Sequence, residues 1–303
     1  MPCPLPARND LKPPISHGSH CRETLVRTWA QWLLRRPPSP PPPPIVAAFL
    51  AVCASAAPAP LPQRSAKILA STKGGYTIPN VGTFNNRKTW NFSKLSDGSN
   101  IPDGLRASSY PVGDNYVFVP QNAYIAGGYL NLKVDGGQKA KPYRSGEVVT
   151  TATNIKYASV RTVAIFSEPP GVCNGMFFYK DDNQETDIEW LSDPASQSNA
   201  GKRQLWFANQ ASNVRSQKSV KGVPPPANPT VTEHEYRIDW VPGAVRFFVD
   251  GAQIWESKQN VPNVPGPWVF NNWADGDKGW SGGPPAKDAI FRIKEIDMYY
   301  NTA

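Results

Sequence analysis

The feature that most constrains this 303-residue chain is a series of short apolar runs that starts near residue 76 and continues to the C-terminus. The runs are rich in Val, Ile, Phe, Tyr and Trp, and Gly, Pro, Asn and Asp separate them. Several alternate polar with apolar residues, which is typical of β-strands that bury one face. The pattern predicts strands at residues 116–119, 129–134, 157–166, 175–179, 185–191, 204–208, 234–241, 245–249, 253–257, 268–273 and 290–300.

The same region contains no long segment with helical periodicity and no internal repeat. Asp250-Gly251 lies between two of the runs and favours a two-residue β-hairpin turn. Many short strands at this spacing predict an all-β fold, either a β-sandwich or a barrel. The absence of a repeat argues against a β-propeller.

Residues 1–64 differ from the rest of the chain in composition. They hold 15 of the 33 prolines, and their seven Lys and Arg against two Asp and Glu supply +5 of the net charge of +8. The basic balance therefore belongs mainly to this segment, and no basic stripe elsewhere suggests a nucleic-acid partner. We expect a Pro-rich extension at 1–64 and one folded domain at 65–303.

Residues 45–57 form an apolar stretch that is too short to span a bilayer comfortably. Arg35 and Arg36 precede it and Ala-Ser-Ala at 54–56 ends it, which is the pattern of a cleaved signal peptide. The alternative is a buried helix or strand. We expect the signal peptide, and hence a secreted, extracellular protein without a membrane anchor, monomeric by default. The sequon Asn91-Phe92-Ser93 predicts N-glycosylation and agrees with secretion.

Three of the four cysteines lie in the N-terminal segment, so the predicted domain holds only Cys173 and no disulfide. A sheet core of this size does not need one. No paired Cys and His spacing indicates a zinc site. Cys173 has no evident His or Asn partner, so a nucleophilic thiol is not expected.

The most informative run contains three acidic residues at alternate positions, Glu185, Asp187 and Glu189. In a strand these side chains share one face, and the intervening Thr, Ile and Trp can pack into a core on the other. Adjacent carboxylates push their pKa values apart, so that one can stay ionised while another keeps its proton. Glycoside hydrolysis needs that division between a nucleophile or base and a general acid.

A retaining mechanism needs two carboxyl groups about 5–5.5 Å apart, whereas four residues of strand separate Cα atoms by roughly 13 Å. The two glutamates must therefore lean together, and the shorter Asp187 between them leaves room to do so. Spacing alone does not decide which glutamate is the nucleophile. The alternative is a polar strand face that only meets solvent.

At these residues the chain resembles glycoside hydrolase family 16, whose motif Glu-x-Asp-x-Glu falls on residues 185–189. The resemblance implies a concanavalin A-like β-jelly roll in which Glu185 is the nucleophile and Glu189 the acid/base, with Asp187 tuning and orienting them. It spans about residues 80–300. Its further segments are Tyr157 to Arg161, Gly175 to Tyr179, His234 to Trp240, Val245 to Gly251, Asn271 to Trp273, and Trp280.

The motif has the regular form, without the extra residue that family members acting on laminarin or agar often carry. In this it resembles the mixed-linkage glucanases, the xyloglucan transglycosylases and the fungal chitin–glucan cross-linking enzymes. The signal, the sequon and the residues around Glu185 most resemble fungal secreted members. Asn183, Gln184 and Trp190 depart from the residues common in bacterial lichenases, which leaves the exact glucan open.

Aromatic rings stack on the apolar faces of sugars, and polar side chains bond their hydroxyls. Trp273 and Trp280 flank a Gly-rich loop and are the best stacking candidates, whereas Trp240 and Trp255 are assigned to the core. Core packing is the alternative for every Trp. The residues we expect to bind substrate are Glu147, Trp206, Gln210, Asn271, Trp273 and Trp280.

We expect no required cofactor and no metal in the active site. Structural calcium is possible, because Asp275, Asp277 and Asp288 lie close in sequence, although they lack a full calcium-loop pattern. The family resemblance adds Asp297, which falls near a calcium-ligating position of some members.

The sequence therefore predicts a secreted retaining endo-β-glucanase that cleaves mixed-linkage 1,3-1,4 or 1,3-type glucan. Two alternatives use the same fold: a cell-wall glucan or chitin transglycosylase, in which a sugar hydroxyl replaces water, and a non-catalytic lectin-like domain. A purely structural extracellular protein is a fourth reading. Three adjacent carboxylates count against the lectin-like domain, since a binding protein has no need of them. For the structural protein, Glu185→Gln should have no effect on any sugar reaction.

Overall fold

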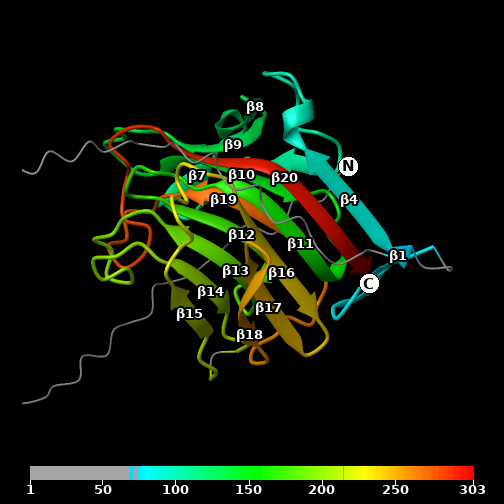
Figure 1. Ribbon diagram of the computed structural model, residues 1–303. Coiled ribbons are helices and arrows are strands. Elements are labelled where there is room, and N and C mark those ends of the chain that lie inside the picture. Colours follow the sequence, from blue (N-terminus) through cyan, green and yellow to red (C-terminus); the bar gives the residue numbers. More distant parts are fainter. Residues whose placement is uncertain (1–68, 71–73, 214) are drawn as a thin grey trace, which may run out of the picture. The chain divides into compact units, whose positions relative to one another are not determined.

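The computed structural model describes residues 69–70, 74–213 and 215–303. The predicted signal peptide and the predicted boundary at residue 64 lie outside this part of the chain. The described residues form two large β-sheets that pack face to face, together with a small three-stranded sheet (Figure 1). The all-β jelly-roll sandwich expected from the sequence is confirmed.

The larger sheet carries the acidic strand near one edge. In spatial order its strands are β15 (Ser219–Val223), β14 (Leu205–Asn209), β13 (Gln184–Leu191), β12 (Cys173–Asp181), β19 (Trp268–Trp273), β10 (Tyr143–Thr150), β7 (Tyr116–Phe118) and β6 (Tyr110–Val112). A ninth strand, β5 (Leu105–Ala107), also pairs with β10. All pairings in this sheet are antiparallel except that of β7 with β10.

The second sheet covers the other side of the core. Its strands are β18 (Ala252–Ser257), β17 (Ala244–Val249), β16 (His234–Val241), β11 (Ile155–Ile165), β20 (Ala289–Thr302), β9 (Tyr129–Val134) and β8 (Ala123–Ala126), with β4 (Asn86–Asn91) paired to β20. The small sheet consists of β1 (Leu69–Ala70), β2 (Tyr76–Ile78) and β3 (Gly82–Phe84). Two 3-10 turns, η1 (Phe92–Lys94) and η2 (Pro120–Asn122), are the helical elements of the described residues, and none there is long and apolar enough to cross a membrane.

The core fills the space between the two large sheets. Alternate residues of each strand enter it, so Ile188 and Trp190 of β13 are both 1% exposed, and Trp190 stacks on Phe166 at a ring distance of 5.3 Å. Trp240 is buried and Trp255 packs against the same cluster, as predicted for both. Burying one face of each strand leaves the other face of the nine-stranded sheet available for chemistry.

Every run predicted as a strand forms one, with ends shifted by a few residues. The Asp250-Gly251 hairpin is also confirmed, since both residues have positive φ, +48° and +80°, as a type I′ turn requires. The short strands β1 to β6, β8 and β15, and the longer β10, were not predicted. Most of these have two to four residues, which is too few for an alternating pattern to show.

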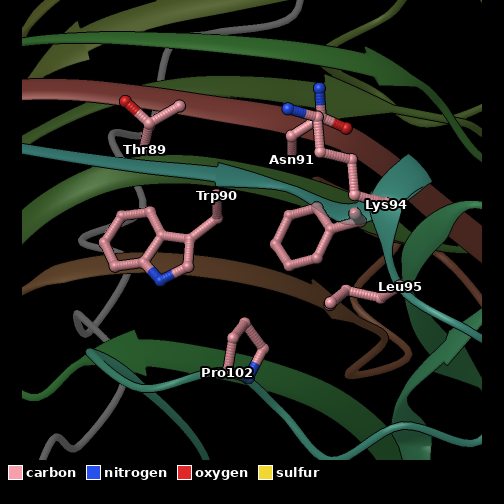
Figure 2. A pocket seen from close by; sticks show the side chains of 7 residues that line it. Thr89, Trp90, Asn91, Lys94, Leu95 and Pro102 are labelled. Carbon is pink, nitrogen blue, oxygen red and sulfur yellow. The ribbon is translucent and has the colours of Figure 1, made fainter.

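A hollow of about 410 Å³ lies beside β4 in the second sheet (Figure 2). Trp90, Phe92, Leu95 and Pro102 give it an apolar lining. The sequon residue Asn91 lies at its rim, where Oδ1 accepts hydrogen bonds from the amide and hydroxyl of Ser93. The hollow belongs to the opposite sheet from the acidic strand, so it is separate from the predicted active site, and N-glycosylation of Asn91 stays a prediction.

Candidate active site

The three acidic residues of β13 project from the face of the nine-stranded sheet that points away from the core, here called the open face. The strand pairs in unbroken register with β12 from Glu185 to Leu191 and with β14 from Thr186 to Trp190, so the motif contains no bulge. Glu185 and Glu189 are half-buried, whereas Asp187 between them is 1% exposed. The regular-strand form expected from the spacing is present.

Glu189 belongs to a row of directly opposed residues that crosses six strands of the open face. From β10 to the sheet edge at β15, this Glu189 row consists of Glu147, Asn271, Gly175, Glu189, Trp206 and Gly222. Four of the predicted site residues therefore lie side by side, although they are far apart in the sequence. Two of the row's positions are glycines, which leave space next to Glu189 and Trp206.

Asp187 belongs to the neighbouring row on the same strands, which has a different character. This Asp187 row consists of Val149, Val269, Phe177, Asp187, Ala208 and Val220. Val149, Phe177 and Val269 form a small apolar cluster of their own on the open face. The only carboxyl of the row thus lies against apolar side chains.

These surroundings control the charge of Asp187. Burial raises the pKa of Asp187 well above its ordinary value, and the neighbouring charges of Glu189 and Glu185 raise it further. The hydrogen bond that Gln210 Nε2 donates to Asp187 Oδ2, 3.2 Å long, acts in the opposite direction without cancelling the rise. Asp187 therefore holds a proton under conditions in which an exposed carboxyl has lost it.

Glu189 has a different neighbour, the thiol of Cys173. The Cys173 Sγ atom lies 3.1 Å from Glu189 Oε1 and donates to it. Cys173 is fully buried, and burial together with the charge of Glu189 raises the pKa of the thiol well above its ordinary value. The thiol is therefore neutral, which agrees with the expectation that it is not a nucleophile.

At the β10 end of the Glu189 row, Glu147 takes part in a buried hydrogen-bond network. Its Oε1 accepts from the hydroxyls of Ser108 and Tyr110, both at 2.7 Å, and its Oε2 accepts from Asn271 Nδ2 at 3.3 Å. Glu147 is 3% exposed and Asn271 5% exposed. The network fixes the side chain of Asn271 beside Gly175, where an added Cβ would lie 2.6 Å from Asn271 Oδ1.

The two predicted stacking tryptophans, Trp273 and Trp280, and the predicted substrate-binding Trp206 are all half-buried, and they form two separate groups. Trp273, at the end of β19, stacks on Tyr116 at a ring distance of 5.2 Å and an angle of 17°. Trp206 and Trp280 lie against each other on the other side of Glu189, 5.5 Å apart and tilted by 51°. The three acidic residues of β13 therefore have a group of aromatic side chains on each side.

The aspartates considered for calcium do not fit a cation site. Asp297 Oδ1 accepts from Arg87 Nε and Thr89 Oγ1, so a guanidinium already holds it. Asp288 binds Lys133 and the amide of Gly136, and Asp275 and Asp277 bond to groups of their own loop. Among the residues that the structure describes, no group of three or more His, Cys, Asp or Glu could hold a metal ion.

Sequence reasoning missed several residues of the site. Gly175 and Gly222 carried a weak signal, because a glycine inside a strand pattern often marks a close approach of other groups. Ser108 and Tyr110 carried none, because Ser108 follows the three-residue strand β5 and Tyr110 begins the three-residue strand β6. Tyr116 begins a run that was predicted as a strand, but nothing in the sequence marked it as a neighbour of Trp273.

Comparison with known proteins identifies the family to which the chain belongs. The model of the family described as glycosyl hydrolases family 16 matches residues 114–288, more than half of the chain. The chain belongs to glycosyl hydrolase family 16. A protein named beta-glucanase from Acetivibrio thermocellus is 25% identical over 196 residues, which are 61% of this chain and 55% of that protein. A xylanase/beta-glucanase from Ruminococcus flavefaciens is 35% identical over 40 residues, 13% of this chain and 5% of that protein.

The chain thus spans about half the length of the Acetivibrio relative, and both named relatives are bacterial, so the fungal resemblance stays a prediction. Solved structures share the fold. A lichenase from a mouse hindgut metagenome superposes with a TM-score of 0.56 at 19% identity, over 72% of this chain and 99% of its own. The endo-β-1,3-glucanase of Pyrococcus furiosus gives a TM-score of 0.58 at 15% identity, over 76% and 99%.

Proposed function

We propose that this protein is a retaining endo-β-glucanase that cleaves internal bonds of β-glucan through a glycosyl-enzyme intermediate on Glu185. The observation that carries the proposal is the presence of three carboxyl groups on one strand face in unlike surroundings. Family membership and the relatives named beta-glucanase support the same activity.

In the first step the carboxylate of Glu185 attacks the anomeric carbon of the sugar on the donor side. Glu189 gives its proton to the glycosidic oxygen, so the bond between carbon and oxygen breaks and an ester to Glu185 forms. In the second step Glu189 takes a proton from water, the water oxygen bonds to the anomeric carbon, and Glu185 is released.

The neutral Asp187 serves this cycle by limiting the charge of the strand. Three ionised carboxylates in a row would repel one another strongly in a half-buried site. With Asp187 protonated, its hydroxyl can donate to an adjacent glutamate while Gln210 bonds its other oxygen. The strand then carries the charge of the nucleophile without a second negative charge beside it.

For the substrate we propose mixed-linkage 1,3-1,4 glucan, with 1,3-linked glucan as the second candidate. The unbroken register of β13 supports the mixed-linkage choice, because that regular form characterises the family branch that acts on such glucans. Solved structures with the same fold include a lichenase and endo-β-1,3-glucanases, so both classes of substrate suit this scaffold.

We also propose that the protein is secreted and acts outside the cell. The apolar stretch at residues 45–57 and the sequon at Asn91 support this. Sequencing the N-terminus of the protein collected from the culture medium tests it, with a start at or after Ala57 expected and retention of residues 1–44 contradicting it.

The activity is tested by incubating the full chain with barley mixed-linkage glucan and, separately, with laminarin, and by mapping the oligosaccharides released. Cleavage of mixed-linkage glucan into short oligomers is expected, with little or slower release from laminarin. The matched control is Glu185→Gln, which keeps the shape of the side chain and removes the nucleophile.

Three other outcomes are informative. Cleavage of laminarin alone would overturn the choice of substrate and keep the mechanism. Products longer than the substrate's own fragments would identify a transglycosylase. Tight glucan binding by the wild type and Glu185→Gln alike, without cleavage by either, would overturn the enzyme in favour of a lectin-like domain.

A further inference from the structure

The core side of the nine-stranded sheet contains a group of polar side chains at the level of Glu189. Asn174 of β12, Asn272 of β19 and Ser167, which comes soon after β11, are each 0% exposed. Asn174 and Asn272 face each other across the β12–β19 pair, and Trp190, opposite Asn174 on β13, belongs to the hydrophobic core. An amide in such a place is costly unless its polar atoms are all bonded.

The hydrogen bonds of these side chains form a closed set, here called the core amide network of Ser167, Asn174 and Asn272. Asn174 Oδ1 accepts from the amide of Ser167 at 2.8 Å, and its Nδ2 donates to Ser167 Oγ at 3.1 Å and to Asn272 Oδ1 at 2.8 Å. Asn272 Nδ2 donates to the carbonyl oxygens of Leu132 and Ala289, both at 2.9 Å. Every nitrogen and oxygen of the two side-chain amides is therefore bonded, and a network satisfied in this way favours one arrangement of its members.

The core amide network connects the two large sheets. Its asparagines lie on β12 and β19 of the nine-stranded sheet, and the carbonyl groups that accept from Asn272 lie on β9 and β20 of the second sheet. The acidic strand joins the same network, because Trp190 Nε1 donates to the carbonyl oxygen of Ser167 at 3.0 Å. Hydrogen bonds depend on direction as well as distance, so the network fixes three neighbouring strands, β13, β12 and β19, relative to the second sheet.

The chain neighbours of these residues lie on the open face around Glu189. Asn174 follows Cys173, whose thiol donates to Glu189 Oε1 at 3.1 Å. It precedes Gly175, the residue directly opposite Glu189 on β12. Trp190 is the residue after Glu189 itself. Because successive side chains of a strand point to opposite faces, a displacement of the network would displace Glu189 and its contacts on the open face.

The position of Glu189 matters differently for different leaving groups. A general acid must lie within hydrogen-bond reach of the oxygen that it protonates, and an error of about 1 Å can reduce the rate by about 10²-fold. A sugar or an unsubstituted phenol leaves slowly unless its oxygen is protonated, whereas a strongly acidic phenol leaves as the anion. A misplaced Glu189 should therefore slow the first kind of substrate much more than the second.

We propose that the core amide network positions the acid/base: Ser167, Asn174 and Asn272 hold β12, β13 and β19 so that Glu189 reaches the glycosidic oxygen. The proposal rests on the proposed function and on Glu189 as the proton donor. The three are positioning residues, because they lie in the core and do not touch the substrate. A purely structural role would instead lower the stability of the fold without changing how the rate depends on the leaving group.

The experiment uses the full chain and a series of aryl β-glycosides that share one β-glucan oligosaccharide as donor. The leaving groups range from 2,4-dinitrophenol, which needs no proton, to phenol, which does. In Asn272→Leu, which replaces the amide by an apolar side chain of similar size, kcat/KM for the phenyl glycoside should fall about 30-fold. For the dinitrophenyl glycoside it should fall about 3-fold or less, so the ratio of the two should fall about 10-fold. Glu189→Gln, which removes the proton donor, gives the lower limit of this ratio.

Two further variants complete the series. Ser167→Ala removes one acceptor of the network and keeps the backbone bonds, so the ratio should fall about 3-fold, and this variant carries the test if Asn272→Leu does not fold. The matched control is Thr150→Val, at the opposite end of β19. Thr150 is 2% exposed, and its Oγ1 accepts from the amide of Trp268 and donates to the carbonyl oxygen of Ala152, both at 2.9 Å. Thr150→Val removes buried hydrogen bonds outside the network, so the ratio should stay as in the wild type.

Equal losses on the two glycosides in Asn272→Leu and Ser167→Ala would limit the network to fold stability and overturn the proposal, while the proposed function would stand. A fall of the ratio in Thr150→Val as large as in Asn272→Leu would also overturn it, because any loss of stability would then displace Glu189. A wild type that cleaves neither the glycosides nor β-glucan overturns the proposed function, and this inference with it.

Discussion

The Glu189 row and the Asp187 row cross the same six strands, one step apart, and give their acidic residues opposite environments. The Glu189 row is largely polar and contains two glycines, and Glu189 also accepts a hydrogen bond from the thiol of Cys173. The Asp187 row is apolar apart from its one carboxyl, which is buried beside Phe177. The apolar surroundings of the Asp187 row raise the pKa of Asp187, whereas Glu189 lies among polar groups and glycines. The surroundings of the three acidic side chains therefore depend on residues of the adjacent strands as well as on the motif itself.

The largest effect is expected from the two glutamates that flank Asp187. Glu185→Gln and Glu189→Gln should each lower kcat on β-glucan by about 10³-fold or more, because one variant removes the nucleophile and the other the proton donor. Thermal unfolding should change little, since both side chains are half-buried on the open face. A variant that keeps a tenth or more of the wild-type rate would remove that residue from the reaction.

The next largest effect concerns the stability that the Asp187 row supplies. Phe177 is 6% exposed, so Phe177→Ala should lower the free energy of unfolding by about 3 kcal/mol, as measured by urea denaturation. Val220, at the edge of the same row, is 39% exposed and gives a matched control. Val220→Ala should change the free energy of unfolding by about 0.5 kcal/mol at most. Equal losses at the two positions would show that burial of the apolar side chains of the Asp187 row does not determine how much each contributes to stability.

The raised pKa of Asp187 predicts a pH dependence of stability. Because its folded-state pKa lies above that of the unfolded chain, the folded state binds the proton more tightly. This contribution is fully present below about pH 4 and is lost as the pH rises through the folded-state pKa, at up to about 1.4 kcal/mol per pH unit.

Asp187→Asn, which is neutral at every pH, should lack that loss. The measurement is the free energy of unfolding of both proteins at intervals between pH 4 and 8, with the difference between them as the readout. If the free energies of unfolding of the two proteins change in parallel with pH over the whole range, Asp187 is ionised in the folded protein. The apolar surroundings of the Asp187 row would then not raise its pKa.

The smallest effect is expected at the thiol of Cys173, which donates to Glu189. A donor to the ionised form of Glu189 favours loss of its proton. Cys173→Val should therefore move the alkaline limb of the kcat/KM profile to higher pH, whereas Cys173→Ser, which keeps a donor, should move it less. Rates at the optimum should change by about 3-fold or less. Identical profiles in the two variants would limit Cys173 to packing.

The sequence could predict the fold and the acidic strand because both depend on local alternation. Glu185, Asp187 and Glu189 had to share a face once residues 185–191 formed a strand, and Trp190 had to point into the core. Strands that join the site from the first half of the chain, such as β5 and β6, are three residues long and carry no such signal.

What the sequence could not supply is the register between distant strands. Glu147 and Asn271 are 124 residues apart, and their pairing decides that Glu147 is enclosed by hydrogen bonds to Ser108, Tyr110 and Asn271. The burial of Asp187 follows in the same way from Phe177, on the strand next to its own. These are tertiary facts, because each depends on which residues face each other across the sheet.

The central claim is that Glu185 carries the glycosyl group while Glu189 transfers the proton. The most direct test is to incubate the full chain with a 2-deoxy-2-fluoro β-glucosyl oligosaccharide that bears a good leaving group, and to locate the added mass by peptide mass spectrometry. Slow turnover of the trapped ester should leave the label on Glu185, with no label in Glu185→Gln. A label on Glu189, or cleavage of glucan with inversion and no label anywhere, would contradict the account.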